Sequence, residues 1–102
     1  MTWPHALASF FAGILLANAV PHFVHGISGD RFPTPFAHPS GKGLSSPTVN
    51  ALWSLFNLAI GALLFRVGRI EGFDGNLGIF FAGVVAITIF SSVHFAGKDA
   101  HF

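Results

Sequence analysis

The chain has 102 residues, of which 52% are hydrophobic and only 9% are charged, and its formal net charge is +1. Because soluble domains carry about 25% charged residues, this composition excludes an ordinary water-soluble domain. Without a run of Lys or Arg the chain also has no electrostatic surface for nucleic acid. The absence of Cys excludes disulfides and thiolate metal sites.

The few charged residues fall into three small groups separated by long apolar segments. Charge-free stretches cover residues 1–29, 43–65 and 75–97, and each exceeds the ~20 residues that a helix needs to cross a hydrocarbon core. The sequence therefore predicts an all-α integral membrane protein whose residues 1–102 form one domain embedded in the lipid bilayer. We expect transmembrane helices at about 6–25, 47–67 and 75–96, with a long Pro/Gly-rich loop at 26–46.

The first segment is apolar on all sides, as expected for a helix surrounded by lipid or by other helices. Pro21 removes a backbone donor, so we expect the helix to kink there or to end one turn later near Gly26. Ala17-Asn18-Ala19 resembles a signal-peptidase site. Since no Lys or Arg precedes it, we expect residues 1–19 to be a retained helix; the alternative is a cleaved signal peptide, which would leave two spans.

The connection at 26–46 is longer than typical connections and rich in Gly, Pro and Ser. Phe32 and Phe36 alternate with Pro33 and Pro35, which predicts a stiff, extended segment. The segment is also apolar enough that we expect it to lie against the membrane interface, where it would act as a lid over the helix ends.

The remaining two helices have clear start signals. Ser46-Pro47 places a capping hydroxyl before a proline at the first helical position. Asp74 is a candidate cap for the third helix. Residues 66–74 are short and glycine-containing, which predicts a tight hairpin between antiparallel helices.

Small residues recur every four positions in the first and third segments, a spacing that lets helix backbones approach closely in lipid. These candidate packing positions are Ser9, Gly13, Ala17, Gly78, Ala82 and Ala86. The first interpretation is that the two helices pack on each other within one chain. The second is that the stripes contact another subunit.

A polar face is predicted on the second helix, where Asn50, Ser54 and Asn57 share one side with Gly61. On the first helix, Asn18 adds a further amide. Buried amides in lipid need partners, so we expect interhelical hydrogen bonds, with a polar pathway as the alternative.

Five of the six histidines are predicted on one side of the membrane: His22, His25, His38, His94 and His101. His22 and His25 would be joined by His94 from the third helix, with His38 or Asp99 from the loop and tail. Neutral imidazole suits Zn, Cu, Fe and Ni, and two facing histidines also hold haem iron. The alternative is structural histidines, which are favoured at helix C-termini by the macrodipole.

No nucleophile motif, paired carboxylate, phosphate loop or zinc-protease motif occurs in the sequence. We therefore expect a structural or accessory subunit, either a homo-oligomer or a part of a larger membrane complex. The alternatives are a metal or haem protein that uses the histidines, and an oligomeric channel or carrier lined by the polar face. The distribution of Lys and Arg does not set the orientation, and we expect a bacterial inner membrane as the location.

Overall fold

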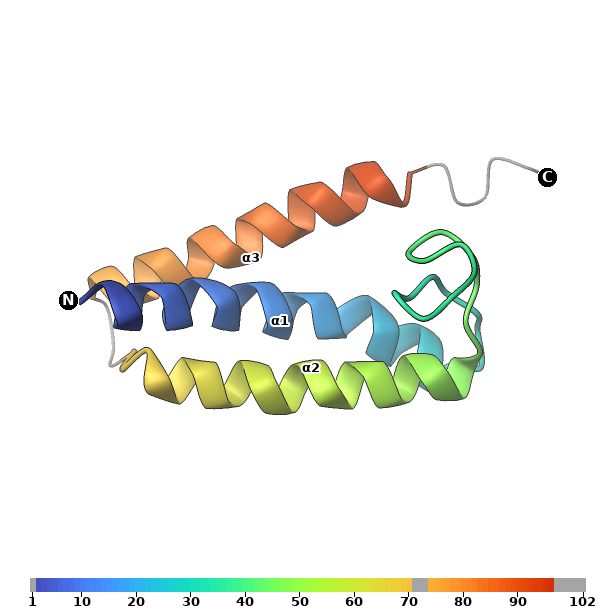
Figure 1. The fold of residues 1–102 in the computed structure, drawn as a ribbon, viewed down its shortest axis with the longest axis horizontal. Coiled ribbons are helices and arrows are strands. Elements are labelled where there is room, and N and C mark those ends of the chain that lie inside the picture. Colours follow the sequence, from blue (N-terminus) through green and yellow to red (C-terminus); the bar gives the residue numbers. More distant parts are fainter. Residues whose placement is uncertain (1, 71–73, 97–102) are drawn as a thin grey trace.

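The computed structural model describes residues 2–70 and 74–96, and these form three helices. They are α1 (Trp3–Ile27), α2 (Pro47–Val67) and α3 (Gly75–His94). Figure 1 shows α1 lying between α2 and α3. All three are long and apolar enough, by length and composition, to cross a membrane. The prediction of an all-helical chain with three such segments is confirmed.

Both predicted helix caps form. The Ser46 hydroxyl accepts a hydrogen bond from the Val49 amide at 3.1 Å. The Asp74 carboxylate accepts one from the Leu77 amide at 2.9 Å. Each cap satisfies an amide that has no partner within the first turn of its helix.

Proline does not end the first helix. α1 contains Pro21 and continues to Ile27, one turn and a half further along the chain. The helix thus ends one residue after Gly26, close to the expected end, and a Cβ at Gly26 would come within 2.7 Å of the Ala51 amide nitrogen of α2. The glycine therefore allows close approach of two helices.

The helices pack through glycines that face neighbouring backbone. A Cβ at Gly13 would overlap the Phe80 carbonyl oxygen of α3, and a Cβ at Gly83 would overlap the Phe10 carbonyl oxygen of α1. On the α2 side, a Cβ at Gly61 would lie 2.7 Å from the Leu16 side chain. Close backbone approach of this kind is the main source of helix association in lipid.

One of the two predicted small-residue stripes lies elsewhere. Ser9 meets Gly68 directly after α2, and Gly13 faces the Phe80 backbone of α3. In contrast Gly78, Ala82 and Ala86 are exposed, and nothing lies within 4 Å of a Cβ built on Gly78. Within this chain α3 meets α1 through Gly83, on a different side of the helix. The first interpretation of the stripe, intrachain packing, is therefore wrong for α3.

Gly68 directly follows α2 and lies against α1. Gly68 has an ordinary right-handed backbone, and a Cβ there would overlap the Ser9 hydroxyl. The left-handed residue that turns the chain is Arg69, with a φ of 54°. Gly68 therefore serves the α1–α2 contact, and the turn is made by a non-glycine residue.

α3 is close to α1 near Gly75 and diverges from it toward His94, as Figure 1 shows. Asn76 and Gly83 are its buried residues, and both belong to its first half. The long loop lies at the end of the molecule where α3 and α1 separate (Figure 1).

The loop is folded on itself. The Phe32 and Ser45 backbones pair, with the Ser45 amide donating to the Phe32 carbonyl at 3.0 Å. Phe32 is 4% exposed and stacks on the His25 ring, whereas Phe36 is 61% exposed. The strand-like pairing of Phe32 with Ser45 places the Phe32 side chain toward the helices.

Candidate functional site

Asn50 joins three parts of the chain at one buried point. Its Nδ2 donates to the carbonyl oxygens of Phe32 at 2.9 Å, Ser45 at 3.3 Å and Ser46 at 3.1 Å. Its Oδ1 lies 2.7 Å from Nδ1 of His22 on α1. The side chain is fully buried, so these contacts hold the loop, α2 and α1 together in the absence of water.

This network sets the protonation of His22. Because Nδ2 of Asn50 faces three carbonyl oxygens, the other amide atom, Oδ1, must face the imidazole. An amide oxygen only accepts hydrogen bonds, so Nδ1 of His22 carries the proton. In the neutral ring Nε2 is then an acceptor with a free lone pair.

The rest of the polar face also turns toward α1. Asn57 is fully buried, donates to the Trp53 carbonyl at 2.7 Å and accepts from Nδ2 of Asn18 at 3.2 Å. Ser54 is fully buried and donates to the Ala51 carbonyl at 2.7 Å. Asn18, Asn50, Ser54 and Asn57 thus lie between α1 and α2, where they act as helix contacts. A face enclosed in this way is not on an outer surface available to a pore.

A cleft of about 250 Å³ opens beside this network, where α3 has diverged from α1. Its walls come from all three helices and from the loop at residues 33–35. The polar or aromatic side chains in this lining include Asn18, His22, Trp53, Phe90, Ser91 and His94. Polar atoms and aromatic rings share this open space, and we take it as the candidate site.

His94 ties the end of α3 to the loop. Its Nε2 lies 2.7 Å from the Gly41 carbonyl oxygen, and its ring stacks on Phe90 with a centroid distance of 5.4 Å. A carbonyl oxygen only accepts, so Nε2 carries the proton and Nδ1 of the neutral ring is an acceptor. The tether holds the loop across one end of the cleft.

The predicted histidine metal site is not supported. No group of three or more His, Asp or Glu side chains able to hold a metal ion occurs in the described residues. His22 is bonded to Asn50, His25 stacks on Phe32 at 4.3 Å, and His94 is bonded to Gly41. Each histidine therefore has its own partner.

The other expected ligands do not complete such a site either. His38 is exposed in the loop. Asp99 and His101 lie outside the described residues. The cleft that His22 and His94 share is smaller than the ~300–1,000 Å³ of sites for drug-sized ligands, so it is too small for a haem macrocycle.

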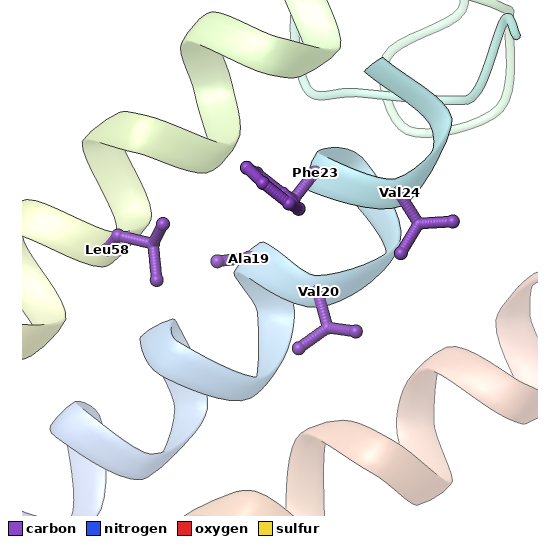
Figure 2. Close-up of a pocket in the computed structure, with 5 residues that line it drawn as sticks. All are labelled: Ala19, Val20, Phe23, Val24 and Leu58. Atoms are coloured by element: carbon purple, nitrogen blue, oxygen red, sulfur yellow. The ribbon is translucent and has the colours of Figure 1, made fainter. Parts of the chain in front are cut away.

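A second hollow is apolar and faces away from this network. Figure 2 shows it between α1 and α2, lined by Ala19, Val20, Phe23, Val24 and Leu58, with Phe23 reaching across from α1. Its volume is about 260 Å³. Since only carbon atoms project into it, it suits hydrocarbon and has no means of selecting a ligand.

Sequence reasoning found only part of the cleft. Asn18, His22 and His94 were singled out, but Trp53, Phe90 and Ser91 were not. A signal was present in the spacing, since Phe90 and His94 lie four residues apart on α3 and so share a face. The Gly41 carbonyl left no signal, because the sequence does not reveal which loop backbone atom meets α3.

Comparison of the chain with protein-family models, with curated proteins and with solved structures finds no match.

Proposed function

We propose that this protein is a small accessory subunit of a membrane assembly, and that it associates with its partner through the outer face of α3. The observation that supports the proposal is the exposed stripe of Gly78, Ala82 and Ala86. The glycines that serve internal packing, Gly13 and Gly83, lie elsewhere. The stripe is therefore free for another helix.

The physical argument concerns the solvent. Lipid tails are as apolar as Leu, so an exposed apolar face is no reason for association in a bilayer. A face made of small side chains is different, because it lets two backbones approach and gain dispersion contacts. α3 makes few contacts in its second half, where Ala86 lies, and a neighbouring helix would supply them.

Substitutions on α3 test the proposal. We expect Ala82→Leu with Ala86→Leu to convert the assembly to monomer, measured by native mass spectrometry in mild detergent and by cross-linking in membranes. Thr88→Leu is the matched control, because Thr88 is also exposed but lies on another side of α3. A wild-type protein that is a monomer without any copurifying partner contradicts the proposal, as does equal disruption by the control.

The same measurement distinguishes the two kinds of assembly. A mass that is a multiple of this chain indicates a homo-oligomer, and an added mass of another size indicates a larger complex. We further infer a bacterial inner membrane as the location. What supports this choice over an outer membrane is that the candidate spans are helices, whereas bacterial outer-membrane proteins span as β-barrels.

The two alternative functions have no observation in their favour. A metal or haem protein needs histidines that converge, and these have separate partners. A channel lined by Asn50, Ser54 and Asn57 needs those side chains on an open face, and they are fully buried against α1.

A further inference from the structure

We infer that the cleft between α1, α3 and the loop binds a neutral aromatic alcohol, that is, a single ring carrying a hydroxyl group, such as a phenol or the headgroup of a quinol. The inference is independent of how the chain assembles. It depends on the hydrogen-bonding state of two histidines, on the rings around them and on the absence of charge.

The first step is the free acceptors. In the neutral rings, Nε2 of His22 and Nδ1 of His94 each carry a lone pair, since the opposite nitrogen of each ring donates to an oxygen. The described residues give neither atom a hydrogen-bond partner. Both rings line the cleft. The cleft therefore presents acceptors that call for a donor from a ligand.

The second step concerns the aromatic residues that line the cleft and the volume of the cleft. Phe90, Phe95 and Trp53 surround the polar atoms with aromatic surface, against which a flat ring packs in offset or edge-to-face contact. The volume of about 250 Å³ lies below the range of drug-sized ligands and is enough for a single ring.

The third step is charge. No Lys, Arg, Asp or Glu is among the described residues that line the cleft. An anion or a cation would lose its hydration there without gaining a counter-charge, which is strongly unfavourable. A phenolic hydroxyl is neutral near pH 7 and is a stronger donor than an aliphatic alcohol, so its single O–H suits a hydrogen bond to one of the two imidazole lone pairs.

A fluorescence titration tests the inference. Trp3 is 74% exposed at the far end of α1, so Trp3→Phe leaves Trp53, in the cleft wall, as the only reporter. The probes are 4-bromophenol and 4-bromoanisole, which share a ring and a quenching bromine but differ in the hydroxyl donor. We expect saturable quenching by 4-bromophenol and at least about tenfold weaker binding of 4-bromoanisole.

Variants that preserve the internal hydrogen bonds locate the acceptors. His22→Asn keeps an N–H near the position of Nδ1, facing Asn50, and removes Nε2. His94→Gln keeps an N–H near the position of Nε2, facing Gly41, and removes Nδ1. The variant that removes the acceptor of the phenolic O–H is expected to weaken 4-bromophenol about 3- to 10-fold, the value of one neutral hydrogen bond. The other variant is expected to change binding little, because one O–H donates to one acceptor. His5→Gln, at the opposite end of α1, is the control and leaves binding unchanged.

The outcomes separate clearly. Quenching that is linear for both probes, equal affinity for both probes, or unchanged binding in both histidine variants with wild-type circular dichroism overturns the inference. Given specific binding, a decyl-substituted benzoquinol serves as the competitor. Its displacement of 4-bromophenol supports a lipid-borne headgroup as the source, and no displacement supports a free phenol.

Discussion

Replacing Asn50 by Ala should destabilise the protein more than the same change at Asn57, although the two sites are matched. Both are asparagines on α2, both are fully buried, and the truncation removes the same atoms. The cavity left behind is therefore similar, and the difference between the two variants reports the hydrogen bonds.

The magnitude follows from what each truncation leaves behind. The carbonyls of Phe32, Ser45 and Ser46 each keep a backbone donor when Asn50 is truncated. Nδ1–H of His22 does not, and His22 is 3% exposed. An orphaned buried donor costs about 1–3 kcal/mol, and interhelical hydrogen bonds in membranes average about 0.6 kcal/mol each. Asn57→Ala instead releases Asn18, which is only half-buried.

We therefore expect the free energy of unfolding to fall by about 1–2 kcal/mol more in Asn50→Ala than in Asn57→Ala. The assay is unfolding by sodium dodecyl sulfate in mixed micelles, followed by Trp53 emission in the Trp3→Phe background. A double-mutant cycle with His22→Phe isolates the pair, with an expected coupling of about 0.6–1.7 kcal/mol. An equal or larger loss in Asn57→Ala, or a coupling near zero, refutes the assignment of Asn50 as the central contact.

Three further outcomes are expected. Gly83→Ala should lower the unfolding free energy by about 1–3 kcal/mol because its methyl group meets the α1 backbone. In the same detergent assay Gly78→Ala, which meets nothing, should cost less than about 0.5 kcal/mol; equal losses would contradict the packing described. Loss of the cap in Asp74→Ala should cost about 0.5–2 kcal/mol, measured as a lower thermal midpoint by circular dichroism, and restored by Asp74→Asn. Because the chain contains no Cys, Lys42→Cys and Arg66→Cys report topology: an impermeant maleimide should label them from opposite sides of the membrane, and labelling of both from one side would exclude α2 as a span.

Chain order and local chemistry allowed the helices to be predicted. Charge-free lengths mark the spans, because a backbone in hydrocarbon satisfies its polar groups by forming a helix. Ser46 and Asp74 mark two helix starts, because a side-chain oxygen next to a free amide is a local interaction. The polar face of α2 was predictable for the same reason, since helical periodicity alone places Asn50, Ser54 and Asn57 together.

The tertiary contacts of each helix face were not predictable from periodicity. Gly78, Ala82 and Ala86 have the spacing of an internal seam, yet α3 turns Gly83 toward α1 and leaves them outside. A stripe shows which side chains share a face, but in lipid no difference in hydrophobicity states which face is inward.

The tertiary partners of the histidines were also not predictable from the sequence. Counting the candidate spans predicted that these histidines lie at one end of the molecule, but their partners depended on tertiary contacts: Asn50 for His22, Phe32 for His25 and the Gly41 carbonyl for His94. The sequence by itself determined three apolar helices with their caps and the residue types gathered at one end. Only the tertiary structure decided that these histidines are separated and that two of them border a cleft, because a loop folded by its own backbone hydrogen bonds and a diverging α3 create that space.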